Sequence, residues 1–287
     1  MNALLGVLFG LLSMSGFGIV DYVVGGSAKK IGAFRTSFWG LASRMPMMLI
    51  LIPLFMKGYS LNAFLLAVIA LAGIAAAAGA LGLSKGMRVG NISIISPITA
   101  SYPIVTILLS LAFLNQQITP IEEACIALIM LGTVLVSLNI ANILKSGTRK
   151  THLGIEFAMV SALGWGFFFF FITVLTEHVG WFASMLFVSV PQFLFYLAYG
   201  HFNKEEFGTF SSNSKAFLAI GILGIIGFIG YNVGVTYTYT AIVTPISAAS
   251  IVITVLMAVA LLKEKLTIHQ KFGIVMVMVG VFLLSIY

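Results

Sequence analysis

The sequence predicts an all-α polytopic membrane protein whose ten transmembrane helices form two inverted five-helix repeats. Three observations support this fold class. Of the 287 residues, 60% are hydrophobic and only 8% are charged, whereas soluble domains average roughly 25% charged residues. The apolar residues occur in runs of about 20, the length that crosses a hydrocarbon core about 30 Å thick. Finally, one half of the chain repeats the other.

The expected spans are separated by short segments that contain Gly, Pro, Asn or charged residues. Residues 1–24 lack the basic segment of a cleavable signal peptide and are predicted to form the first span. A polar joint at residues 144–152 separates the fifth span from the sixth. The ten predicted spans are Ala3–Val24, Ala33–Met56, Ala63–Ser84, Asn91–Phe113, Ile121–Ala141, Leu153–Thr176, Trp181–Tyr199, Lys215–Thr236, Ala241–Leu262 and Ile268–Ile286.

The last helical hairpin, Thr244–Ile286, repeats the segment that begins at Ser96. Matching residues are 148 positions apart, as for Pro97 and Pro245. The same offset relates further pairs, namely Gly16 and Gly164, Gly32 and Gly180, Ala100 and Ala248, Thr106 and Thr254, and Gly132 and Gly280. The repeats are predicted at residues 1–143 and 153–287. Since each has an odd number of spans, the second enters the membrane from the opposite side, as in many secondary transporters.

The basic residues predict the orientation, because short cytoplasmic loops are rich in Lys and Arg. Segments after the odd-numbered spans carry thirteen Lys or Arg residues, whereas the opposite side carries only Lys57. We therefore expect the odd-numbered loops to be cytoplasmic and both termini to face outward.

Two glycine stripes recur at helical spacing in the third and eighth spans. Small residues allow transmembrane helices to approach closely, so tight packing is the main interpretation, and a sliding surface between repeats is the alternative. The stripes are Gly73, Gly79, Gly82 and Gly86, and Gly221, Gly224, Gly227, Gly230 and Gly234.

Arg44 lies about halfway along the second span, where a charged side chain is costly and usually faces a cavity or a partner. Its guanidinium could hold a carboxylate or phosphate of a substrate in a bidentate contact. The alternatives are a structural ion pair with Asp21, the acid of the first span, and a side chain that extends along the helix to the membrane surface. Asp21 is accordingly interpreted either as this counter-ion, which we favour, or as a proton site.

Other polar and aromatic residues of the spans are candidate substrate contacts. Gln192 occupies the repeat position of Arg44 and is expected near the pseudo-two-fold axis, where substrates of inverted repeats bind. Trp39, Tyr102 and Trp165 are aromatic candidates within the spans, and Asn232 is a polar candidate. An aromatic belt at the membrane surface is the alternative role for aromatic residues.

Three prolines, Pro97, Pro103 and Pro245, lie inside predicted spans, where proline removes a helical hydrogen bond and bends the helix. Each is interpreted either as a static kink or as a gating hinge.

Signatures of enzymes are missing: there is no HExxH or Walker A motif, and no GxSxG in the strand-to-helix context of a hydrolase. The four histidines are at predicted membrane edges, and Cys125 is the only cysteine. We therefore expect no enzymatic activity, no metal site and no cofactor.

The repeated pattern of a proline-containing helix, a tight turn and a Gly-containing last helix resembles the EamA-type members of the drug/metabolite transporter superfamily. The closing segment resembles the family's turn, with Glu264 as its usual acid, although the first repeat has Asn115, Gln116 and Gln117 there. The resemblance implies a central cavity between the repeats and export or exchange of amino acids, other small metabolites or drugs. Many relatives have cytoplasmic termini, in contrast to the orientation expected here.

The function expected from these features is secondary transport of small metabolites by alternating access, with Arg44 binding an anionic group. The alternative is a membrane receptor or scaffold that binds a ligand without moving it. The expected partners are a small-molecule substrate and membrane lipid of the cell membrane, but no nucleic acid. A proton as coupling ion and a homodimer are left open.

Overall fold

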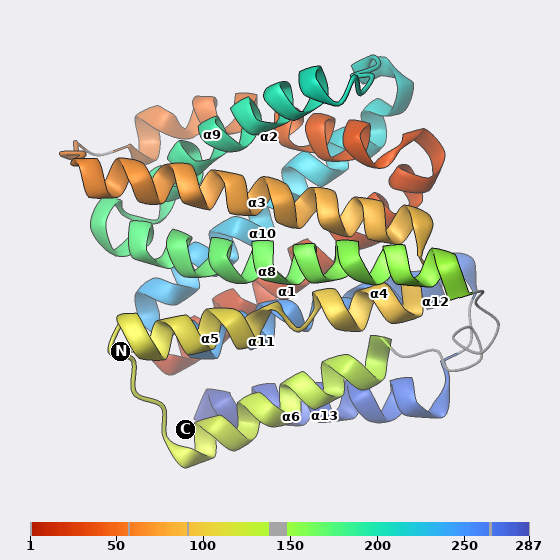
Figure 1. The fold of residues 1–287 in the computed structure, drawn as a ribbon. Helices are drawn as coiled ribbons and strands as arrows, with labels where there is room; N and C mark the ends of the chain where they lie inside the picture. The colour runs from red at the N-terminus through yellow and green to blue at the C-terminus, as the bar shows by residue number, and fades with distance from the viewer. Residues whose placement is uncertain (1, 57, 91, 138–147, 264–265, 287) are drawn as a thin grey trace.

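The protein is described by a computed structural model that covers residues 2–56, 58–90, 92–137, 148–263 and 266–286 (Figure 1). Lys57, Lys145, Glu264 and Lys265, which the sequence singled out, lie outside these residues. Helices account for nearly all of the described chain. They are α1 (Ala3–Ile31), α2 (Ala33–Phe55), α3 (Ala63–Val89), α4 (Ile92–Thr99), α5 (Tyr102–Phe113), α6 (Pro120–Ser137), α8 (Thr148–Val179), α9 (Trp181–Phe202), η1 (Phe210–Asn213), α10 (Ser214–Tyr237), α11 (Thr240–Ala248), α12 (Ser250–Leu262) and α13 (Ile268–Ile286).

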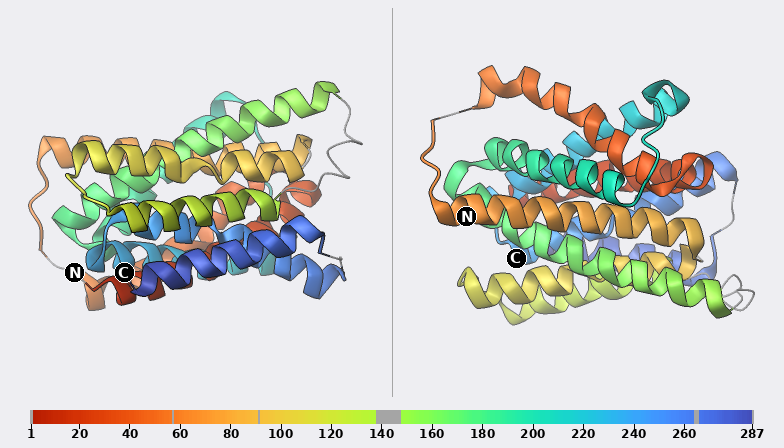
Figure 2. Two further views of the ribbon diagram at one scale, coloured as in Figure 1. Left: turned by 90° about the horizontal axis from the view of Figure 1, so that it is seen from below. Right: turned by 45° about the horizontal axis from the view of Figure 1, so that its top comes forward.

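The ten predicted spans are confirmed. Among the described residues, nine helical segments are long and apolar enough to cross a membrane, and a shorter apolar segment covers Pro97–Phe113. All of the helices run roughly along one direction in Figure 1, so their ends form two opposite faces. Both termini lie on the same face, which we call the terminal face, and we call the other the basic face (Figure 2).

Several helix ends differ from the prediction. α1 continues to Ile31 instead of ending at Val24, and α3 continues to Val89 instead of Ser84. The basic residues that were expected in loops therefore occupy the last turns of these helices. Cations are stabilised at a helix C-terminus, and their long side chains reach the membrane surface, so basic residues do not end these helices. α8 likewise begins at Thr148, inside the predicted polar joint.

Two glycines that are counterparts in the repeat terminate two counterpart helices. Gly32 follows α1 with φ +100°, and Gly180 follows α8 with φ +81°. Side chains rarely adopt such positive φ values, whereas glycine does so readily. Each glycine alone connects its helix to the next, so α2 and α9 begin immediately.

The fourth and ninth spans are interrupted helices. The fourth span is divided into α4 and α5 at Ala100 and Ser101, and the ninth into α11 and α12 at Ala249. Pro97 lies inside α4 and Pro245 inside α11, a few residues before each interruption. Both spans are therefore broken at corresponding places, near the middle of each span.

Close helix crossings confirm the packing interpretation of the glycine stripes. A Cβ at Gly16 of α1 would lie 2.6 Å from the backbone N of Gly227 in α10. The counterpart contact joins α8 to α3, where a Cβ at Gly164 would lie 2.5 Å from the backbone N of Gly79. Because the two contacts are related by the repeat offset, the first helix of each repeat crosses the third helix of the other repeat at equivalent glycines.

A hydrogen bond from a threonine hydroxyl also recurs at each interrupted span. Thr106 donates to the carbonyl of Gly166 at 2.9 Å, and its counterpart Thr254 donates to the carbonyl of Gly18 at 2.8 Å. Each bond joins the interrupted span of one repeat to the first helix of the other repeat. The repeats are thus interlocked around a pseudo-two-fold axis.

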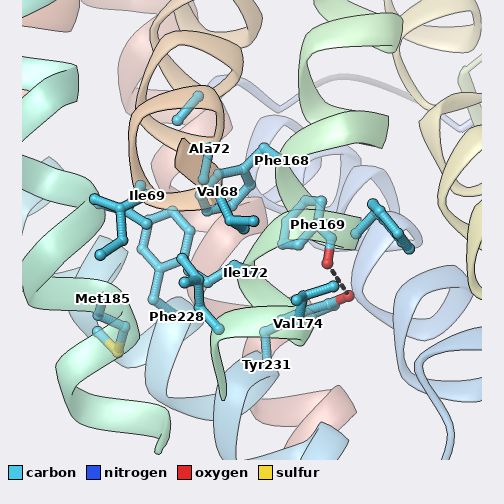
Figure 3. Close-up of a cluster of buried hydrophobic side chains, with 14 of the residues drawn as sticks. Val68, Ile69, Ala72, Phe168, Phe169, Ile172, Val174, Met185, Phe228 and Tyr231 are labelled. Atoms are coloured by element: carbon cyan, nitrogen blue, oxygen red, sulfur yellow. Dashed lines mark hydrogen bonds between the residues drawn. The ribbon is translucent and has the colours of Figure 1, made fainter. Parts of the chain in front are cut away.

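The main hydrophobic core lies toward the terminal face, between α3, α8, α9 and α10 (Figure 3). It contains a row of aromatic and branched side chains from α8, including Phe168, Phe169 and Ile172, which contact Phe228 and Tyr231 of α10. The two interrupted spans also differ between the faces: among the described residues, α5 packs against α11, whereas α4 and α12 have little or no contact. The molecule is therefore closed on the terminal side.

Candidate functional site

A cavity with about 1180 Å³ of space between atoms, part of it open to the outside, lies between the two repeats. Helices of both repeats line it, as expected for a site on the pseudo-axis. On α1, α2 and α3 the lining includes Val24, Thr36 and Met87, which belong to the halves of these helices nearest the basic face. The cavity therefore extends from the middle of the membrane toward the basic face. Its lining is mostly apolar and aromatic with a few polar side chains, as in small-molecule sites.

Arg44 of α2 lines this cavity. Its Nη2 donates to Oε1 of Gln192 on α9 at 3.2 Å, so the structure joins the two counterpart residues. The guanidinium carbon also lies 4.6 Å from the ring centroid of Phe228. The Nε of Arg44 is buried without a hydrogen-bond partner, and no carboxylate lies within ion-pair distance among the described residues. Arg44 thus retains hydrogen-bonding capacity that a ligand could use.

Asp21 of α1 lines the same cavity but does not form the ion pair with Arg44 that the sequence suggested. Its Oδ2 accepts a hydrogen bond from the hydroxyl of Ser250 at 3.2 Å, at the start of α12. In the described part of the chain the salt bridge that is formed joins Arg35 to Glu206, at the basic face. Among the described residues, an arginine and a carboxyl group therefore face one cavity without forming an ion pair.

Aromatic rings form the inner end of the cavity. Tyr102 stacks on Phe169 with centroids 5.0 Å apart, and Trp165 lies 5.9 Å from the same ring. Phe169 continues this row to Tyr231, at a centroid distance of 4.4 Å. Tyr102 and Trp165 thus line the cavity as candidates, and Phe169 separates it from the core on the terminal side.

The other two candidate contacts, Trp39 and Asn232, do not line the cavity. The indole Nε1 of Trp39 donates a hydrogen bond to the carbonyl of Phe207 at 2.8 Å. This bond links α2 to the segment between α9 and α10. Asn232 is fully buried, and its Nδ2 donates to the carbonyl of Trp181 and to the hydroxyl of Ser184, at 3.2 and 3.3 Å. Substrate contact by either residue stays a prediction.

The three prolines border the interruptions of the spans. Pro97 and Pro245 lie inside α4 and α11, and Pro103 occupies the first turn of α5, where proline fits a helix start. The cavity lining includes residues on both sides of each interruption, among them Thr99 and Ser250. The prolines therefore shape the walls of the cavity, and their role as hinges stays a prediction.

Symmetry identifies the centre of the cavity. For most residues that line the cavity, the residue 148 positions away in the other repeat does not line it. For a smaller set, both members of the pair line the cavity, so these residues lie around the pseudo-axis. We call this set the central site. It comprises the pairs Phe17 and Trp165, Asp21 and Phe169, Arg44 and Gln192, Ala80 and Phe228, Ala100 and Ala248, and Tyr102 and Ser250.

Sequence reasoning did not single out Phe17, Phe228, Ser250 or Tyr196 of the lining. The repeat contained a signal for Phe17 and Ser250, since they are the counterparts of Trp165 and Tyr102. Phe228 is the counterpart of an alanine, and nothing distinguishes it from the many phenylalanines of the spans.

Comparisons with known proteins agree with this architecture. The sequence model of the EamA-like transporter family matches the chain twice, at residues 4–138 and 152–286. One solved crystal structure of a protein is similar over 100% of this chain and 96% of its own chain, with a TM-score of 0.75. Its sequence identity is 14%, so the likeness shows the fold alone. No curated protein matches the chain.

Proposed function

The chain belongs to the EamA-like transporter family, a family of membrane transporters, and from this premise we propose that it is a secondary transporter working by alternating access. The proposed cargo is a small metabolite such as an amino acid or a related organic solute. The proposed process is export or exchange across the cell membrane. The family and the apolar helices make the chain an integral multi-pass membrane protein.

The proposal rests on one observation: among the described residues, Arg44 and Asp21 face a cavity on the pseudo-axis without forming an ion pair. Within the described part of the chain, the buried Nε of Arg44 has no hydrogen-bond partner, and Asp21 accepts a hydrogen bond from Ser250. A buried charge without an ion-pair partner is costly and is usually found in membrane proteins where function needs it. These charges support a polar or charged solute at this place.

In the proposed binding mode, Arg44 and Gln192 hold an anionic group of the solute. Tyr102 and Trp165 flank its apolar part, since both rings line the cavity. Pro97, Pro103 and Pro245 would allow the interrupted spans to bend as the cavity opens and closes.

A proton is the coupling ion that we propose, with Asp21 as its site. Asp21 lacks a salt bridge among the described residues, which supports proton binding over the role of a counter-ion for Arg44. The other titratable groups lining the same cavity are Arg44, Tyr102 and Tyr196. Coupling predicts that an inward proton gradient accelerates solute movement in the opposite direction, whereas Asp21→Asn removes this acceleration.

We also propose that the basic face is cytoplasmic, following the distribution of Lys and Arg. The cavity would then open to the cytoplasm in this conformation. Since one chain supplies both walls of the cavity, a single chain is the proposed transport unit, and a homodimer would join two such units.

Counterflow in proteoliposomes tests the function. A thermal-shift screen of amino acids and small organic acids first selects a solute, because a ligand that binds the folded state stabilises it. Vesicles loaded with that unlabelled solute should then accumulate the radiolabelled solute transiently. Binding without counterflow would instead favour a receptor or scaffold and would contradict transport. No enzymatic conversion of the solute is expected.

A further inference from the structure

Helix α10 of the second repeat crosses two helices of the first repeat at glycines. A Cβ at Gly221 would lie 2.5 Å from Oγ of Ser43 in α2, and a Cβ at Gly227 would lie 2.5 Å from a ring carbon of Phe17 in α1. Gly224 lies between these crossings, and a Cβ there would meet no atom of the described residues within 4 Å. The surface of α10 is therefore uncovered at Gly224.

The open space at Gly224 is inside the molecule. A Cβ at three other described glycines, Gly26, Gly58 and Gly180, would likewise meet nothing within 4 Å, but all three residues are exposed. Gly224 is buried and lines the cavity between the repeats. The space in front of Gly224 is therefore part of this cavity.

Two large side chains of α10 border this space. Ile220, Gly224 and Phe228 follow one another at intervals of four residues, and all three line the cavity. Residues four apart lie on the same face of a helix. We call the space in front of Gly224, between Ile220 and Phe228, the notch. Since both bordering side chains are apolar, the notch suits an apolar group.

The notch is next to Arg44. The guanidinium carbon of Arg44 lies 4.6 Å from the ring centroid of Phe228, and a Cβ at Gly221 would lie 3.1 Å from the backbone N of Arg44. No atom of Arg44 lies within 4 Å of the Cβ position at Gly224, so the arginine side chain does not fill the notch. A solute whose anionic group binds Arg44 can therefore place an adjoining apolar group there.

Packing explains the glycines on either side of Gly224 but not Gly224 itself. The counterparts of the two neighbouring glycines are also glycines at close crossings, Gly73 and Gly79. The counterpart of Gly224 is Ala76, which is 1% exposed in the main core. Glycine weakens a helix relative to alanine, and no described neighbour requires glycine at position 224. The consequence of its missing side chain is a larger cavity.

We propose that Gly224 determines which solutes fit the cavity, because the notch receives the apolar group of a solute whose anionic group is bound by Arg44. This proposal rests on the proposed transport function and narrows the substrate class to solutes in which an anionic group adjoins an apolar group. Phe228 joins the two parts of the site, since its ring lies against Arg44 and borders the notch.

Side chains of different size at position 224 test the proposal. The probes are alanine, norvaline and norleucine as free L-amino acids, because they share their charged groups and differ only in the length of an apolar chain. Isothermal titration measures their binding to the wild type, Gly224→Ala and Gly224→Leu. Gly26→Leu is the matched control, since a side chain at position 26 also meets open space but is exposed on α1.

The wild type should bind norleucine about tenfold or more tightly than alanine, because one methylene in an apolar pocket changes discrimination about 10- to 200-fold. Gly224→Leu should weaken norleucine binding about tenfold or more and leave alanine binding within about threefold. Gly224→Ala should have an intermediate effect, and Gly26→Leu should bind all three probes as the wild type does. Equal weakening for norleucine and alanine, or no weakening for either, would overturn the proposal.

Melting temperatures separate an effect on the cavity from an effect on folding. Gly224→Ala should melt at or above the wild-type temperature, because alanine favours a helix over glycine. Gly221→Ala should melt lower, because its Cβ would lie 2.5 Å from the side chain of Ser43. A lower melting temperature for Gly224→Ala would contradict the open space. If Gly224→Leu does not yield monodisperse protein, Gly224→Ala provides the comparison of norleucine with alanine.

Counterflow separates this proposal from the proposed function. If the wild type binds none of the three probes but the solute selected by thermal shift shows counterflow, the role of the notch is wrong and transport stands. If Gly224→Leu changes the preference among the probes but no bound solute shows counterflow, the notch is supported and transport is contradicted.

Discussion

Arg44 is the residue on which substrate binding is proposed to depend. We predict that Arg44→Gln weakens binding of an anionic solute roughly 10- to 100-fold, because hydrogen bonds to charged groups contribute about 1.5–3 kcal/mol. Glutamine keeps a polar side chain beside Gln192 but removes the charge. Isothermal titration with the solute selected by thermal shift measures the effect.

Arg35→Gln is the matched control on the same helix. Arg35 pairs at the basic face with Glu206, whose side chain is 82% exposed, and exposed ion pairs contribute little to stability. Its affinity for the solute should stay within about twofold of the wild type. If the Arg44→Gln variant bound the solute as tightly as the wild type, Arg44 would have only a structural role.

At the scale of single residues, the sequence predicted several residues of the cavity lining but not how their side chains pair. The repeat offset places Gln192 opposite Arg44, and the structure joins them by a hydrogen bond. The ion pair with Asp21 could not be decided, because its formation depends on side-chain directions that sequence spacing does not determine. Trp39 was predicted as an aromatic substrate contact, but its indole donates a hydrogen bond to the carbonyl of Phe207, a long-range contact that no local pattern predicts.

At the scale of helices, the glycine stripes make a clear prediction. Gly16→Ala should lower the melting temperature and the yield of monodisperse protein, because its Cβ would lie 2.6 Å from the backbone of α10. Overpacking of this kind typically costs about 1–3 kcal/mol. Thermal unfolding in detergent measures the change.

Gly26→Ala on the same helix is the control, since a Cβ there would meet no atom within 4 Å. Its melting temperature should equal or exceed that of the wild type, because alanine favours a helix over glycine. A wild-type melting temperature for Gly16→Ala would contradict the proposed close contact between α1 and α10.

The interrupted spans give the second prediction at this scale. Pro245→Ala should restore a backbone donor, straighten the region of α11 and slow counterflow, while binding of the solute persists. Pro53→Ala, on the exposed surface of α2, removes a proline that borders no interruption. Its counterflow rate should match the wild type. Unchanged counterflow by Pro245→Ala would indicate a static kink.

The sequence predicted spans well because hydrophobic runs and loop residues are local signals. It could not locate the interruptions after Thr99 and Ala248, since proline inside an apolar span is equally compatible with a continuous bent helix. Helix ends were predicted too short at α1 and α3, because basic residues also occur in the last turns of membrane helices.

At the scale of the whole molecule, two interlocked repeats enclose one cavity that extends toward the basic face. A second cavity of about 220 Å³ lies next to it on the terminal side, and the repeat counterparts of its lining residues all line the larger cavity. The repeat, which is visible in the sequence, predicts that both faces can open. The sequence could not predict which face is open, because both states use the same residues and differ only in packing.

The central claim is transport by alternating access, in which the two inverted repeats would exchange conformations. Spin labels at Phe113→Cys and Thr236→Cys on the terminal side report the distance between α5 and α10. Labels at the counterpart positions, Leu261→Cys and Arg88→Cys, report the equivalent distance between α12 and α3 on the basic side. All four positions are exposed, and both pairs are made in the Cys125→Ala background.

Double electron–electron resonance on both pairs, with and without saturating solute, is the most direct measurement. We predict two distance populations for each pair, such that any increase in the long distance on the terminal side accompanies an equal decrease on the basic side. Distances that stay single in both pairs, or that lengthen together, would contradict the exchange of conformations between the repeats.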